Sequence, residues 1–107
     1  MEVTPVSEAG LQKAVLELAK ANGWDLRYHE RRGGAHWSLG SGLPDLILVR
    51  APRMVMAELK TETGQLGPKQ VQWLDALNEV SRVHGSPEVY VWRPSDLRDG
   101  TIASLLR

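Results

Sequence analysis

The sequence predicts an α/β fold in which a central mixed β-sheet is flanked by helices, with its elements in the order α-β-β-β-α-β. Three observations support this prediction. Two segments carry apolar residues at helical spacing, four shorter segments are rich in strand-forming residues, and glycine or proline stands at most of the boundaries. With 107 residues, the chain is expected to form one domain over residues 1–107 around a single core.

The first elements are a helix, a strand and a long loop. The helix is predicted over residues 7–22, with Gly23 able to end it, because apolar residues recur there at helical spacing: Leu11, Ala14, Val15, Leu18 and Ala19. Residues 24–29 are predicted to form a short strand. Residues 30–42 contain four glycines, and a loop of this length inside a compact domain usually has a function or is mobile.

A β-hairpin is predicted in the middle of the chain. Residues 43–50 are apolar on both faces after Asp45, which is typical of a central strand that is buried on both sides. Ala51 and Pro52 predict a turn, and residues 53–60 are predicted to form the second strand of the hairpin.

A second helix and a fourth strand complete the predicted core. The helix is expected from Pro68, which suits a first helical position, to about His84, with Gly85 as its end. Its inward side is predicted from apolar residues at helical spacing: Val71, Leu74, Leu77 and Val80. Residues 88–92 are predicted to form the last strand, and residues 95–107 one or two helical turns.

The composition excludes several classes of protein. There is no cysteine, which rules out disulfides and thiolate zinc sites, and no apolar run is long enough to cross a bilayer. We therefore expect a cytoplasmic protein that does not act on membranes. Thirteen Lys and Arg balance thirteen Asp and Glu, and this neutral total argues mildly against a nucleic-acid ligand, although basic residues cluster in the glycine-rich loop.

Three charged residues are expected to meet at one end of the hairpin. Side chains alternate along a strand, so Glu58 and Lys60 should share a face, and hairpin pairing should bring Asp45 beside Glu58. Two adjacent carboxylates repel unless a cation lies between them, and oxygen ligands select Mg²⁺ or Mn²⁺. With Lys60 placed to steady a hydroxide or a phosphate, the trio suits metal-assisted phosphodiester hydrolysis. The alternative is that Asp45 caps a turn and that Glu58 and Lys60 form a solvated ion pair.

Two polar residues continue the apolar stripes of the helices. Glu8 lies about 20° from Val15 on the helical wheel, and Gln70 stands in the same relation to Leu77. Burying an unsatisfied polar group costs roughly 1–3 kcal/mol, so each needs a partner, and the simplest common one is the Asp45–Glu58 site or its waters. Taken alone, Glu8 could instead be an acid favoured at a helix N-terminus, and Gln70 an ordinary exposed residue.

The pattern Pro44-Asp45 followed by Glu58-Leu59-Lys60 resembles the PD-(D/E)XK nuclease superfamily, whose restriction-endonuclease-like core has the αβββαβ order. More narrowly, SGLPDLILVR, MAELKTETGQLGPKQVQWLDAL and VYVWRPSD are similar to the VRR-NUC family, especially its small stand-alone phage and bacterial members. The likeness extends over residues 7–96. The stretch after Pro44-Asp45 is the most specific part, since the short anchors occur often by chance.

The resemblance implies a role for each of the residues just described. Asp45 and Glu58 would bind the metal, with the backbone carbonyl of Leu59 as a possible third ligand. Lys60 would be the catalytic lysine and Gln70 the active-site glutamine of the second core helix. Glu8 matches the acidic residue of the first helix, which would serve a second metal or an outer-shell water.

Other residues are candidates for contact with nucleic acid. The candidates for phosphate binding are Arg31, Arg32, His36 and Lys69. Trp37, beside the basic residues of the loop, could touch nucleic acid or anchor the loop. Trp73 and Trp92 are expected to pack in the core or at an edge.

Together these observations predict a Mg²⁺- or Mn²⁺-dependent DNA endonuclease. The resemblance implies branched or otherwise structured DNA, such as a Holliday junction, as the substrate. A homodimer is expected, because one site cuts one strand and two-fold symmetry supplies a second site. The alternative is a monomer that a partner protein directs to its substrate. Candidates for an apolar interface are Trp92, Ile102, Leu105 and Leu106. The alternatives are a catalytically inactive nucleic-acid-binding module with the same fold, and a structural or inhibitory protein.

Overall fold

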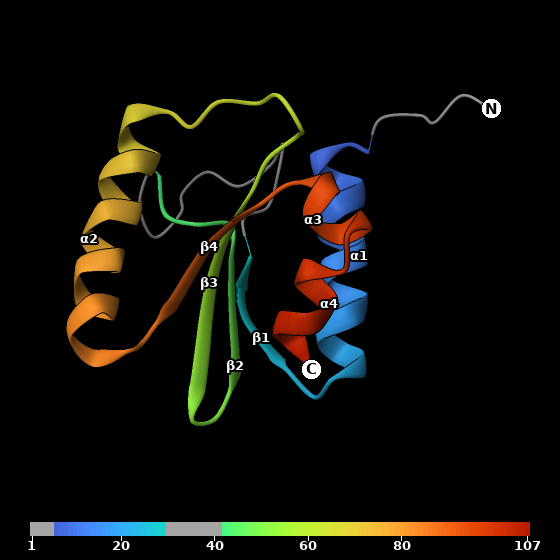
Figure 1. The fold of residues 1–107 in the computed structure, drawn as a ribbon, viewed down its shortest axis with the longest axis horizontal. Coiled ribbons are helices and arrows are strands. Elements are labelled where there is room, and N and C mark those ends of the chain that lie inside the picture. Colours follow the sequence, from blue (N-terminus) through green and yellow to red (C-terminus); the bar gives the residue numbers. More distant parts are fainter. Residues whose placement is uncertain (1–5, 30–41) are drawn as a thin grey trace.

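The computed structural model describes residues 6–29 and 42–107, and its elements follow the predicted order (Figure 1). The helices and strands are α1 (Glu8–Ala21), β1 (Asp25–His29), β2 (Leu46–Arg50), β3 (Arg53–Leu59), α2 (Pro68–His84), β4 (Glu88–Trp92), α3 (Pro94–Arg98) and α4 (Thr101–Leu106). The prediction of an α/β fold with a restriction-endonuclease-like arrangement is confirmed. The predicted loop lies outside the described residues, except for Gly42.

The described strands form one four-stranded sheet in the order β1-β2-β3-β4. Strand β2 pairs antiparallel with β1 and with β3, whereas β3 and β4 run parallel. Parallel neighbours cannot be joined by a tight turn, and α2 forms the crossover between β3 and β4. The sheet is therefore mixed, as the sequence predicted.

Strand β2 begins later than predicted, because the residues before it hydrogen-bond differently. Pro44 has no N–H to donate to a strand ladder. Asp45 accepts the N–H of Leu59 with its side-chain Oδ2, at 2.8 Å, and the regular pairing starts only at Leu46. Lys60 likewise lies just after β3, although its N–H still donates to the carbonyl of Trp92 at 3.0 Å.

The main core lies on one face of the sheet, beneath α1, α3 and α4 (Figure 1). Helix α1 begins at the N-cap Ser7, whose hydroxyl accepts the N–H of Gly10 at 3.0 Å, and its buried residues follow the predicted stripe. The buried sheet residues of this core are Leu46, Leu48, Val55, Ala57, Leu59 and Trp92. Those of the helices are Leu11, Val15, Ala19, Ile102 and Leu106.

The C-terminal residues belong to this core, which corrects their prediction as an interface patch. Trp92, Ile102 and Leu106 are buried, and Leu105 packs against them while partly buried. The indole N–H of Trp24 donates to the carbonyl of Leu106 at 2.8 Å and ties α4 to the end of α1. The sequence shows that these residues are apolar, but α1 alone leaves part of the sheet face open, and α4 covers it.

Helix α2 lies on the other side of the sheet and packs against β4 (Figure 1). Its inward side is formed by Gln70, Leu74 and Leu77, so the prediction of Val71 and Val80 as inward residues is wrong. These two valines are 40% and 47% exposed. The reason is rotational: each residue turns the helix by about 100°, and Gln70 faces the sheet, so Val71 is turned away from it.

No helix in the described ranges 6–29 and 42–107 is long and apolar enough to cross a membrane.

Gly42 fixes how the chain enters the sheet. Its φ is +89°, a left-handed conformation that favours glycine. A Cβ added there would lie 2.5 Å from the carbonyl carbon of Lys69 and 2.9 Å from the nitrogen of Gln70. The segment that leads to Asp45 therefore runs directly against the backbone of the first turn of α2.

We expect Gly42→Ala to destabilise the protein more than Gly85→Ala does. Both glycines have positive φ, which costs another residue about 1–2 kcal/mol, but no atom of the described residues lies within 4 Å of a Cβ at Gly85. Overpacking adds about 1–3 kcal/mol at Gly42 alone. Urea denaturation of the two variants measures the difference, and equal losses would contradict the close approach.

Candidate functional site

Asp45 and Glu58 meet where the hairpin β2–β3 leaves the core. The register pairs Leu46 with Ala57, so the next residues along the two strands, Asp45 and Glu58, lie beside each other. Both are buried, with 7% and 2% of their surfaces exposed. The N–H of Leu59 holds the Asp45 carboxylate at 2.8 Å. Glu58 alternates with the core residues Ala57 and Leu59, so it faces the α2 side of the sheet.

Burial and the neighbouring acid change the ionisation of Glu58. Desolvation by burial, followed by repulsion from Asp45, raises the pKa of Glu58 from its ordinary 4.5 to about 8. The positive charge of Lys60 opposes this shift without cancelling it. The pair is thus an electrostatically unfavourable arrangement, which a cation between the carboxylates would relieve.

The first turn of α2 places Gln70 next to Glu58. Gly67 is the N-cap and Pro68 the first helical residue, which makes Gln70 the third. Its Oε1 accepts the N–H of Gly67 at 2.8 Å, and its Nε2 donates to Oε2 of Glu58 at 2.6 Å. One amide therefore both caps the helix and orients the carboxylate. The structure brings Asp45, Glu58 and Gln70 together, as the sequence analysis expected.

The donor set fits a hard divalent cation. Oε1 of Glu58 is buried and has no hydrogen-bond partner among the described residues, although the other oxygen is held by Gln70. A buried acceptor without a partner costs free energy unless a ligand satisfies it, and carboxylate oxygens suit Mg²⁺ or Mn²⁺. Asp45 and Glu58 would hold the ion. The backbone carbonyl of Leu59, which follows Glu58 in the sequence, remains the candidate third ligand.

Glu8 comes from a different element than this pair. It begins α1, is partly exposed, and belongs to a helix that packs on the opposite side of the sheet from α2 (Figure 1). Within the described part of the chain, no three Asp, Glu or His side chains gather closely enough to hold a metal ion. A role for Glu8 at a second metal or an outer-shell water stays a prediction.

Sequence reasoning missed Arg93, which holds the loop after Lys60. Its Nη1 donates to the carbonyls of Thr61, Glu62 and Gly64 at 2.6, 3.2 and 2.7 Å. This loop connects Lys60 to the N-cap of α2, so one guanidinium fixes the path between the lysine and Gln70. The signal available in the sequence was an arginine directly after the last strand, inside the stretch VYVWRPSD.

The predicted phosphate-binding residues divide into two groups. Lys69 is exposed on the first turn of α2, next to Gln70. Arg31, Arg32 and His36 lie outside the described residues, as does Trp37.

Comparison with known proteins gives one family. The VRR-NUC domain matches residues 29–86, which is just over half of the chain and includes Asp45, Glu58, Lys60 and Gln70. The chain has no significant match among curated proteins or among solved structures.

We expect the metal-free protein to lose stability as the pH rises from about 4.5 to about 8. Because the pKa of Glu58 is raised in the folded state, the folded protein keeps a proton that the unfolded chain has lost over this range. The free energy of unfolding therefore falls as pH rises, by up to a few kcal/mol at about 1.4 kcal/mol per pKa unit.

Urea denaturation in EDTA at the two ends of this range measures the effect. The amide side chain of the Glu58→Gln variant cannot titrate. The free energy of unfolding of this variant should therefore fall less than that of the wild type as the pH rises. Parallel pH profiles for the wild type and the variant would show that Glu58 is not responsible.

Proposed function

Because the chain belongs to the VRR-NUC domain family of PD-(D/E)XK-like nucleases, we propose that it is a Mg²⁺- or Mn²⁺-dependent DNA endonuclease whose site is built from Asp45, Glu58 and Lys60. Membership of the family implies nuclease activity with DNA as the substrate. The metal, the mode of cleavage and the residue roles belong to the proposal.

The observation that carries the proposal is the buried carboxylate pair. Two acids that are 7% and 2% exposed lie side by side, and one oxygen of Glu58 has no partner among the described residues. An arrangement of this kind destabilises a fold unless it serves a ligand, because buried carboxylates need compensating charge. A salt bridge on the surface, the alternative interpretation of these residues, would leave both acids solvated.

Each residue of the site has a distinct task in this proposal. A divalent cation at this site would supply Lewis-acid chemistry to the phosphate and its attacking water. Asp45 and Glu58 would hold the cation, and Gln70 keeps the Glu58 carboxylate oriented through its 2.6 Å hydrogen bond. Lys60 supplies a positive charge where negative charge develops on the phosphate. Glu8 is proposed to serve a second metal or an outer-shell water.

We expect Asp45→Ala, Glu58→Ala and Lys60→Ala each to abolish nicking of a supercoiled plasmid that the wild type nicks with Mn²⁺ and not with EDTA. Losing a ligand or the charge on Lys60 should lower the rate by several powers of ten, since each factor of ten corresponds to about 1.4 kcal/mol of barrier. Glu79→Ala is the matched control, because Glu79 is exposed on α2 and pairs with Arg82.

Variants of the three residues that retain near-wild-type nicking would overturn the site. A wild type that binds DNA but never nicks it would instead identify a catalytically inactive binding module.

The preferred substrate and the working assembly are further parts of the proposal. One site cuts one strand, so a homodimer with closed two-fold symmetry is expected to cut two strands of branched DNA such as a four-way junction. Phosphate contacts are assigned to Arg31, Arg32, His36 and Lys69, and the setting to the cytoplasm of a bacterial or phage-infected cell.

We expect light scattering at micromolar concentration to give a dimer, and a four-way junction to be cut faster than a linear duplex of the same sequence. A monomer that cuts both DNAs equally well would contradict the dimer and the junction preference. The nuclease assignment would still stand.

A further inference from the structure

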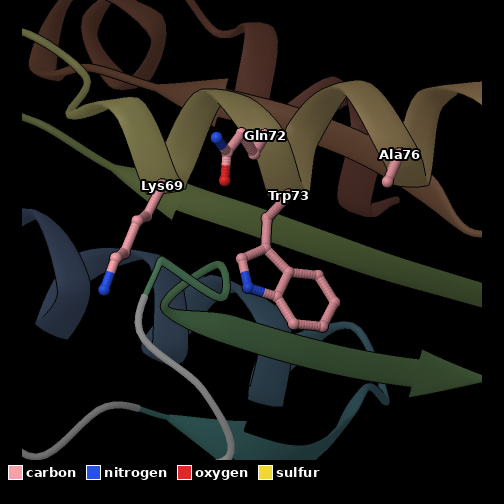
Figure 2. Close-up of a pocket in the computed structure, with 4 residues that line it drawn as sticks. All are labelled: Lys69, Gln72, Trp73 and Ala76. Carbon is pink, nitrogen blue, oxygen red and sulfur yellow. The ribbon is translucent and has the colours of Figure 1, made fainter.

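A hollow of about 520 Å³ opens along α2 beside the candidate site (Figure 2). The described residues that line it are Lys69, Gln72, Trp73 and Ala76. Their spacing of three or four positions places them along one side of the helix. Figure 2 shows Lys69 and Trp73 extending from that side toward the segment that enters β2.

Two contacts place the start of α2, where the hollow begins, close to the carboxylate pair. Gln70, next to Lys69, donates its side-chain N–H to Glu58 at 2.6 Å. The backbone of Lys69 also lies against Gly42, three residues before Asp45. A DNA strand whose phosphate reaches Asp45 and Glu58 therefore passes the first turns of α2.

The side chains that line the hollow are suited to binding a nucleotide. Trp73 is 36% exposed, although an indole of this size is usually well buried, and its ring offers a flat apolar face. Lys69 adds an exposed positive charge, Gln72 an exposed amide that can donate and accept, and Ala76 a small side chain that leaves room for a ring. The first turn of α2 contains no acidic residue that would repel a phosphate. The volume lies in the range of about 300–1,000 Å³ that is usual for small-molecule sites.

We propose that this hollow receives one unpaired nucleobase of the DNA strand being cut, next to the scissile phosphate. Trp73 stacks on the base, Gln72 contacts its edge and Lys69 binds the adjoining phosphate. In intact duplex both faces of each base are covered by its neighbours, so only an unstacked base can enter. The inference rests on the proposed nuclease function and narrows its substrate to DNA with unpaired nucleotides beside the cut.

The decisive experiment removes the indole and the base separately and together. The affinity of the metal-free protein is measured in EDTA by fluorescence anisotropy, for a duplex with a short unpaired segment and for its fully paired counterpart. In a second series, an abasic site replaces each unpaired nucleotide in turn. The variants are Trp73→Ala, Trp73→Phe as the conservative change, and Val83→Ala as the control. Val83 is 61% exposed near the other end of α2, outside the hollow.

Trp73→Ala should weaken binding to the unpaired segment roughly five- to a hundredfold and leave binding to the paired duplex nearly unchanged. Trp73→Phe should retain most of the affinity, and Val83→Ala all of it. One abasic position should weaken binding to the wild type but not to Trp73→Ala, because the stacking partner is already missing there. In cleavage assays with Mn²⁺, the same variant should raise KM much more than it lowers kcat.

The proposal is wrong if Trp73→Ala weakens both DNAs equally, or if no abasic position is coupled to Trp73. It is also wrong if the variant changes only the oligomeric state, since Trp73 would then cover a second copy of the chain. The binding measurements need no cleavage. A wild type without nuclease activity would therefore refute the proposed function, whereas the base-binding proposal would still be decided by the affinities of the Trp73 variants.

Discussion

The structure depends on holding two carboxylates side by side away from water. The hairpin register imposes the contact between Asp45 and Glu58, because Leu46 pairs with Ala57 and Asp45, just before β2, therefore lies beside Glu58. The surrounding groups limit the resulting repulsion: a backbone N–H holds Asp45, and Gln70 holds one oxygen of Glu58. Those donors come from β3 and from the first turn of α2. The geometry of the site therefore depends on how α2 packs against the sheet.

The region that matches the family model does not coincide with the segments that build the hydrophobic core. Residues 29–86 contain the proposed chemical groups, from Asp45 to Gln70, whereas much of the buried apolar surface that supports them comes from α1 and α4, outside the match. Strand β4 also lies outside it, as does Arg93 directly after that strand, which fixes the loop between Lys60 and α2. The flanking segments thus act on the site through packing and backbone contacts.

The hairpin and its acidic pair could be predicted from the sequence, because strand alternation and a short turn leave little freedom in register. The rotation of α2 could not: its valines suggest one inward side, but Gln70 is held at Glu58 and turns Val71 outward. The role of Arg93 could not be predicted for another reason. Its acceptors are backbone carbonyls, which every residue has, so the amino-acid types of the loop give no sign of the contact. Burial of the C-terminal residues likewise depends on a sheet face that only the folded chain defines.

The parallel pairing of β3 with β4 has a consequence for the order of assembly. A hairpin forms in about 1–10 μs from neighbouring residues, whereas pairing across a helical crossover must close a long loop and is slower. A chain folded only as far as α2 would hold all four polar side chains of the site but would lack the strand and the guanidinium that fix the loop after Lys60. The candidate site would thus be completed late, after the long-range contacts have formed, so a partly folded chain would lack the arrangement proposed for cleavage.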